Sequence, residues 1–164
     1  MKSPKNIKNV INFKKKVFIL LELKWVKKNK IDDLSAMFKG KKNIISIDLS
    51  SLDTQNVTKE DFMFCGCESL KYLNLAFFDT HNVTDMDSMF SGCINLQYLD
   101  LSSFNTKKVT NMRAMFYGCE NLHYLDLSSF DLKMLIQNLC LPGFHALIII
   151  YVQKNLLINM KIFI

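Results

Sequence analysis

A unit of 26 residues recurs along this chain, and that fixed period constrains the fold more than any other feature. The dipeptide Met-Phe marks each copy, at Met37-Phe38, Met63-Phe64, Met89-Phe90 and Met115-Phe116. Leucines keep the same step, as Leu70, Leu73 and Leu75, then Leu96, Leu99 and Leu101, then Leu122, Leu125 and Leu127. A period of this length is typical of a stacked solenoid, in which each repeat packs only against its neighbours.

The leucine-rich part of the repeat predicts a short strand. In the segment 98–102 leucine alternates with polar residues, and a period of two places leucine on one face and polar side chains on the other. Such a strand buries its leucines only if neighbouring repeats pair in parallel, roughly 4.8 Å apart. We therefore expect Leu73, Leu99 and Leu125 to stack as one ribbon.

The second half of the repeat predicts a short helix. Its apolar residues recur at spacings of three and four, as Val83, Met86, Met89 and Phe90, which suits about two turns of helix. Thr84 is a candidate N-cap, Gly92 is a candidate C-terminal cap, and Asp85 and Asp87 carry negative charge that a first turn favours. The predicted fold class is an α/β repeat: a right-handed leucine-rich-repeat solenoid with short parallel strands on the concave face and short helices on the convex face.

Charge is distributed unevenly, although the chain as a whole carries +6. Residues 1–43 hold thirteen lysines against three acidic residues, whereas residues 44–131 hold five basic residues against twelve acidic ones. A basic end can attract nucleic acid or an anionic membrane, but these lysines are scattered and lack arginine. We interpret 1–16 as a flexible, solvated basic leader. The acidic repeats argue against a nucleic-acid groove.

The repeat region is predicted to span 17–131. A shift by one period aligns Leu21 with Ile47, so the leader runs into a degenerate first repeat of the kind that caps a solenoid. A signal peptide is not expected, because the apolar run 17–21 is short and no small-residue cleavage site follows it. Beyond 131 the register fails, since Leu141-Pro142 stands where Met-Phe is due and proline disrupts a helix interior.

The segment 132–164 is predicted to be an irregular apolar tail. Its apolar run 144–152 is interrupted by Gln153-Lys154-Asn155, whereas a membrane helix needs about 20 mostly apolar residues. We interpret the tail as a terminal helix or strand packed on the open end of the repeats, with a membrane segment as the alternative. A further hypothesis is a frameshift, because codons for Thr-Lys-Asn-Val read one base late give the Leu-Lys-Met-Leu of 132–135.

Three of the five cysteines keep the repeat step, as Cys67, Cys93 and Cys119. A zinc site is not expected, because Cys65-Gly66-Cys67 has no partner Cys-x-x-Cys motif and the histidines are out of register. Neighbouring cysteines in a column could reach disulfide distance, yet free cysteine is also a small buried hydrophobe. We predict a column of buried thiols.

A sequence motif recurs with the same 26-residue period. Phe-x-x-Cys-x-x-Leu-x-x-Leu-x-Leu begins at Phe64, Phe90 and Phe116. An Asn-Val-Thr turn stands at Asn56 and Asn82. Over about residues 31–131 the chain resembles the BspA-type leucine-rich repeats, the 26-residue repeats of bacterial and protist surface proteins. The resemblance implies a cell-surface or secreted protein that binds host or partner molecules and has no catalytic centre.

The outward residues of the strands are the candidate partner-binding residues. Tyr72, Tyr98 and Tyr124 form one column, and Asp100 and Asp126 belong to the next. Exposed tyrosines beside polar groups suit protein recognition; alternatively, they cover the sheet and stack for stability. Like charges in the aspartate column should raise a carboxylate pKa or attract a cation. We interpret this column as a solvated acidic strip, because the spacing of a sheet does not wrap a metal ion.

A catalytic site is not expected, and no cofactor is implied. His81, His123 and His145 have no serine or cysteine placed to pair with them in a recognisable motif; a cysteine–histidine hydrolase is the alternative. The predicted function is a non-catalytic module for protein–protein interaction or adhesion, with a protein ligand and no nucleic acid. Membrane association is left open. The alternatives are an intracellular repeat scaffold and a truncated gene product without a binding role.

Overall fold

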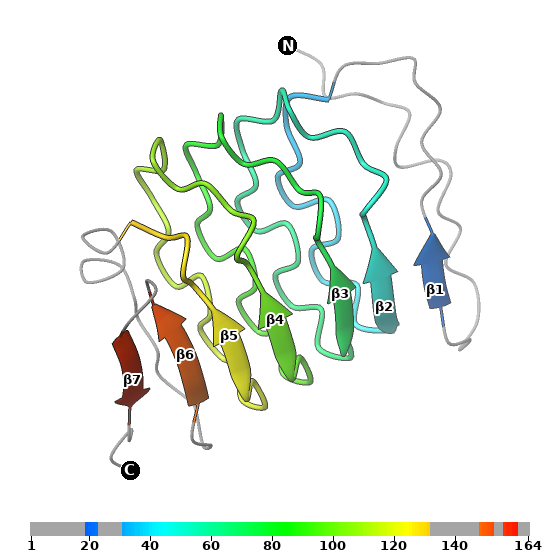
Figure 1. Ribbon diagram of the computed structural model, residues 1–164. Coiled ribbons are helices and arrows are strands. Elements are labelled where there is room, and N and C mark those ends of the chain that lie inside the picture. The colour runs from blue at the N-terminus through cyan, green and yellow to red at the C-terminus, as the bar shows by residue number, and fades with distance from the viewer. Residues whose placement is uncertain (1–18, 23–30, 132–147, 153–155, 161–164) are drawn as a thin grey trace.

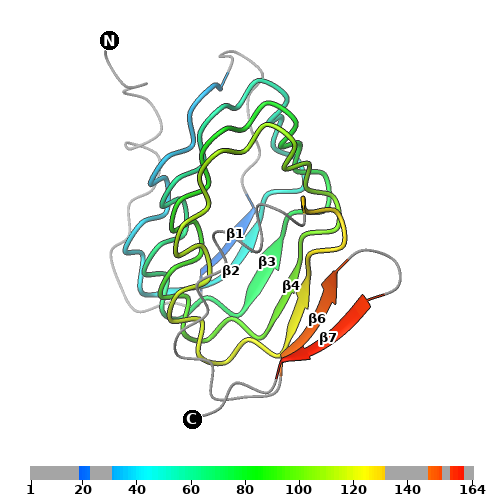
Figure 2. The ribbon, with the colours of Figure 1, turned by 90° about the vertical axis from the view of Figure 1, so that its left-hand side faces the viewer.

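Short strands at regular intervals make up the regular structure of this chain. The computed structural model describes residues 19–22, 31–131, 148–152 and 156–160, with side chains over 31–131 (Figure 1). The strands are β1 (Ile19–Glu22), β2 (Ile44–Asp48), β3 (Tyr72–Asn74), β4 (Tyr98–Asp100), β5 (Tyr124–Asp126), β6 (Ile148–Val152) and β7 (Leu156–Met160). They form one sheet of order β1-β2-β3 and another of order β4-β5-β6-β7. Figure 2, which looks along the stack, shows the repeats following nearly one outline with the strands on one side.

The strands pair in the register that the repeat predicts. Within the first sheet β1, β2 and β3 are parallel, and Ile47 of β2 lies opposite Leu21 on one side and Leu73 on the other. In the second sheet Leu99 of β4 lies opposite Leu125 of β5. The predicted equivalence of Leu21 and Ile47 is therefore confirmed. Equivalent residues of successive repeats lie side by side, an arrangement compatible with a repeat solenoid.

The predicted leucine ribbon is interrupted between β3 and β4. These strands belong to different sheets, and Leu73 is only partly buried, whereas Leu99 and Leu125 are buried. The expectation of one continuous ribbon was wrong at this step. The break coincides with the repeat whose sequence departs from the pattern, because Ala76-Phe77 stands where the next repeat has Ser102-Ser103.

The helices predicted for the second half of each repeat are absent from the described residues. The segment 86–93 instead forms overlapping turns, as where the N–H of Met89 donates to the carbonyl of Met86. Ser88 has φ of 53°, a left-handed conformation that an α-helix excludes. Gly92 has the left-handed φ expected of a C-terminal cap, 71°, but no helix precedes it. Turns closed over three residues reproduce the spacing of three and four. The buried residues that suggested a helix are Val83, Met86, Met89 and Phe90.

Every second N–H group of this segment, from Met86 to Gly92, bonds to the next repeat instead of along the chain. The N–H of Met86 donates to the carbonyl of Asn111 at 2.8 Å. Thr84 is not an N-cap, since its hydroxyl donates to the carbonyl of Thr58 at 3.2 Å. No helix follows Asp85, so it meets no helix dipole; its Oδ1 accepts the N–H of Asp87 at 3.0 Å. Isolated parallel bridges join equivalent positions, Asp33 to Lys59, Lys59 to Asp85, and Asp85 to Asn111.

The core is built from columns of equivalent side chains. Four buried phenylalanines stack with centroids 5.5, 5.5 and 5.8 Å apart, Phe38, Phe64, Phe90 and Phe116. Stacked rings at such distances attract one another beyond their burial. Buried threonines connect neighbouring repeats: Thr54 Oγ1 donates to the carbonyl of Asp79 at 3.0 Å and accepts the N–H of Asp79 at 2.7 Å. The threonines therefore satisfy their own buried hydroxyls while they align the repeats.

Two strands lie within the predicted tail. β6 pairs in parallel with β5, with Ile150 opposite Leu125, and β7 pairs antiparallel with β6, with Ile158 opposite Ile150. Of the helix and the strand predicted for the tail, these residues form strands, and the strands extend the second sheet. The predicted leader 1–16 and the frameshift site at 132–135 lie outside the described residues. Among the described residues no helix has the length and apolar character to cross a membrane.

Candidate interaction face

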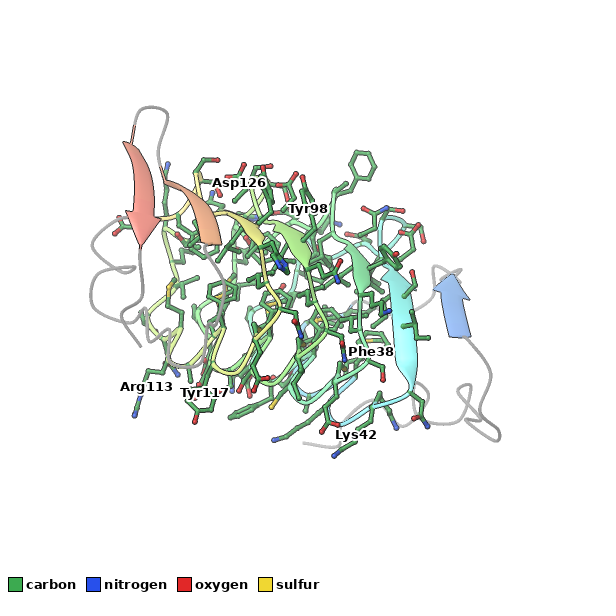
Figure 3. The ribbon with its side chains drawn as sticks, turned by 90° about the horizontal axis from the view of Figure 1, so that it is seen from below. Phe38, Lys42, Tyr98, Arg113, Tyr117 and Asp126 are labelled. Carbon is green, nitrogen blue, oxygen red and sulfur yellow. The ribbon has the colours of Figure 1, made fainter. Side chains whose placement is uncertain are left out.

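The candidate site is the outward face of β3, β4 and β5, called here the strand face. Each strand presents a tyrosine and then an aspartate or asparagine outward, with a leucine between them. In β4 this places Tyr98 and Asp100 in solvent and Leu99 in the core, because alternate side chains of a strand point to opposite sides. Figure 3 shows Tyr98 and Asp126 beside the strands, and Tyr117 on the other side of the repeats.

The tyrosine column is unequal along its length. Tyr98 and Tyr124 stack with ring centroids 4.3 Å apart and planes within 6°. Tyr124 is half-buried, its hydroxyl lies 3.4 Å from Oδ2 of Asp126, and burial raises the pKa of its phenol. Tyr72 lies across the break and is 67% exposed, against 54% for Tyr98. Tyr124 is therefore largely covered by its neighbours in the sheet, while Tyr72 and Tyr98 leave more than half of their surface exposed to solvent.

The acidic column has a structural role beside any binding role. Oδ1 of Asp100 accepts the N–H of Ser102 at 2.9 Å, and Oδ1 of Asp126 accepts the N–H of Ser128 at 2.8 Å. Asn74 makes the same contact in the repeat before. Each is an Asx turn, in which the side chain closes the backbone at the end of the strand.

The expectation that crowded carboxylates raise a pKa was wrong for Asp48, the first member of this column. Its pKa is lowered, mainly because the backbone N–H of Ser50 donates to the carboxylate at 2.9 Å. A hydrogen bond to the charged form favours ionisation. Asp48, at the end of the neighbouring strand β2, is therefore charged at neutral pH.

One prominent aromatic residue on this side was missed from the sequence. Phe77 follows β3 and is 77% exposed, although phenylalanine elsewhere in the repeats is largely buried. Its position is occupied by serine in the other repeats, as Ser51, Ser103 and Ser129. The signal was therefore available, since an apolar residue replaces a small polar one at a fixed repeat position. Exposed aromatic residues thus occur in β3, directly after β3 and in β4, as Tyr72, Phe77 and Tyr98.

The described histidines and cysteines do not form a catalytic pair. Nδ1 of His81 contacts Oδ1 of Asp79 at 2.7 Å, and Nε2 contacts the amide of Asn82 at 2.7 Å. The backbone N–H of His81 is the main cause of a lowered pKa at Asp79. Neither ring nitrogen is bonded to a thiol or hydroxyl in the part of the chain that the structure describes. His145 lies outside that part.

The predicted column of buried thiols is confirmed. Cys67, Cys93 and Cys119 are buried and free of disulfides. Each thiol donates to the carbonyl of a core phenylalanine at 3.1, 3.3 and 3.1 Å, respectively Phe38, Phe64 and Phe90. Burial raises the pKa of Cys67 and of Cys119 to about 12 and also raises that of Cys93. We therefore expect these thiols to react slowly, because the thiolate is the reactive form. Over 31–131 and the described strands, no cluster of three or more His, Cys, Asp or Glu is placed to hold a metal ion.

Parallel strands in 26-residue register, with stacked side chains inside and an aromatic and acidic face outside, define a repeat protein. Residues 6–139 match the family described as Mycoplasma protein of unknown function, DUF285. The chain belongs to this family. No curated protein and no solved structure matches it.

Proposed function

We propose that this protein is a non-catalytic binding module that recognises a protein ligand through the strand face. The observation that supports the proposal is the exposure of Tyr72 and Tyr98 beside Asp100 on strands that the buried columns hold in place. Tyrosine supplies broad contact area at a small cost in side-chain entropy. Residues of this type dominate the binding energy of protein interfaces.

The handedness of the repeats and the curvature of the strand face are part of the same proposal. Leucine-rich repeats of the BspA type coil in a right-handed sense with the strands on the concave side, and the motif of this chain resembles theirs. A concave strand face would surround a ligand on more than one side, so several tyrosines would contact it together. The proposed role is adhesion at the cell surface. Soluble cytoplasmic protein on cell fractionation would favour a scaffold instead.

Capture from extracts of surface-labelled host cells tests the proposal. We expect Tyr72→Ala/Tyr98→Ala to lose a labelled partner that the unchanged protein retains. Tyr117→Ala is the matched control, because Tyr117 is 52% exposed and lies on the other side of the repeats (Figure 3). Thermal unfolding followed by circular dichroism shows whether each variant is folded. Equal recovery by the tyrosine variant and the unchanged protein would remove the proposal.

A further inference from the structure

The strand face combines exposed aromatic rings with carboxylates. On this face Tyr72 and Tyr98 are 67% and 54% exposed, and Phe77, three residues beyond the end of β3, is 77% exposed. Tyrosine and phenylalanine rings attract cations over their faces. The adjacent Asp100 is exposed and holds the N–H of Ser102 with Oδ1, which leaves Oδ2 without a hydrogen bond among the described residues. Rings that bind the stem of a long side chain therefore lie beside a carboxylate that binds its charged end.

The negative charge of the described repeats also favours a cationic ligand. Residues 31–131 carry eight basic and fourteen acidic residues. Lys42 is engaged elsewhere, since its Nζ lies 2.7 Å from Glu68. Lys71 precedes Tyr72, but among the described residues it forms no ion pair with the aspartate column. A surface of this sign attracts cationic partners and repels nucleic acid.

We propose, resting on the function proposed above, that the ligand is a lysine- or arginine-rich segment of a partner protein. It docks across the break between β3 and β4, over Tyr72, Phe77 and Tyr98, with its cations against the aspartate column. Arginine fits this face better than lysine, because its planar guanidinium both stacks on rings and pairs with carboxylates. Complementary charge also accelerates the encounter, so binding weakens as salt rises.

Fluorescence anisotropy with three labelled peptides tests the inference. The peptides repeat Gly-Arg-Arg, Gly-Gln-Gln or Gly-Glu-Glu three times, so they differ only in charge. We expect the arginine peptide to bind the full chain, more weakly at high salt, and the uncharged glutamine peptide not to bind. Asp100→Asn/Asp126→Asn should weaken this binding by about threefold to tenfold. Asparagine keeps the Asx turn, as Asn74 shows.

A second pair of substitutions removes the same charge from the far side. Asp33→Asn/Asp85→Asn changes positions half a repeat from the strands, where Asn111 occupies an equivalent place. We expect this control to bind the arginine peptide as the unchanged protein does. Phe77→Ser, which introduces the residue of the other repeats, should weaken binding while the fold is kept. Equal losses in the two asparagine variants would overturn the inference, because attraction would then come from total charge alone.

The outcomes separate this inference from the proposed function. If the arginine peptide fails to bind while partner capture still depends on Tyr72 and Tyr98, the inference is wrong and the proposed function stands. If the peptide binds and Phe77→Ser and Asp100→Asn/Asp126→Asn both weaken it, the inference holds. If neither peptide binding nor partner capture depends on the strand face, the inference and the proposed function are both wrong.

Discussion

Glu60 gives the sharpest test of how the repeats are packed. Its side chain is fully buried, and neither carboxylate oxygen has a hydrogen-bond partner among the described residues. The equivalent position holds Met86 and Met112 in the following repeats. Burial, with a smaller contribution from the charge of Asp79, raises the pKa of Glu60 from 4.5 to about 8. The charged form is thus disfavoured in the folded protein.

The difference in pKa sets the magnitude and the pH range of the effect. Because the pKa of Glu60 is higher in the folded state, folding takes up a proton at this residue, and the contribution of Glu60 to stability is fully present below pH 4.5. Between pH 4.5 and about 8 the free energy of unfolding should fall by about 1.4 kcal/mol per pH unit, or about 5 kcal/mol in total. Asp48 and Asp79 act at lower pH, since their pKa values are lowered and their contribution is lost on acidification.

Urea unfolding followed by circular dichroism from pH 5 to pH 8.5 measures this dependence. Glu60→Met restores the residue of the later repeats, so we expect a flatter profile and at pH 7 a gain of about 3 kcal/mol. Glu60→Gln is the control: it removes the charge but leaves a buried amide that costs about 1–3 kcal/mol. Its profile should also flatten, without the gain. If the unchanged protein and Glu60→Met lose stability in parallel as pH rises, Glu60 is not buried in the core.

Three further predictions concern the packed columns. Leu99→Asp should lower the free energy of unfolding by more than about 3 kcal/mol or abolish cooperative unfolding, because Leu99 is 1% exposed and an unpaired buried charge costs about that much. A urea midpoint equal to that of the unchanged protein would contradict this. Phe90→Ala should lower the free energy of unfolding by about 3–5 kcal/mol. The loss should exceed that of Phe38→Ala, because Phe90 stacks on two rings and Phe38 on one. Equal urea midpoints for the two variants would argue against the stack. Iodoacetamide should label the half-buried Cys65 before Cys93 in native protein, and mass spectrometry showing rapid labelling of Cys93 would restore the hydrolase alternative.

The register of the repeats and the contents of the core were predictable from the sequence. A strict period fixes which residues are equivalent, so counting alone places Leu99 opposite Leu125 and collects the phenylalanine and cysteine columns. The break between β3 and β4 was not predictable in this way, because periodicity assumes that all repeats pair alike. It lies beside the repeat that carries Phe77 in place of serine.

The helix prediction failed because spacing reports burial and not the direction of hydrogen bonds. Val83, Met86 and Met89 are buried in overlapping turns as they would be on a helix face. The outcome was decided by the N–H groups, which bond to the neighbouring repeat. The roles of Asp100 and Asp126 were half predicted, since their outward position was expected and their Asx turns were not. Aspartate two residues before a serine at a strand end is the signal that indicates such a turn.

The most direct test of the account is a NOESY spectrum of the full chain with labelled leucine and phenylalanine. Packing of equivalent residues in register predicts cross-peaks between the rings of Phe64 and Phe90 and between the methyl groups of Leu99 and Leu125. It also predicts cross-peaks between repeats, and no helical pattern of amide contacts, over 84–92. Helical amide contacts along that segment, with the two pairs of side chains out of contact, would contradict the fold and with it the strand face.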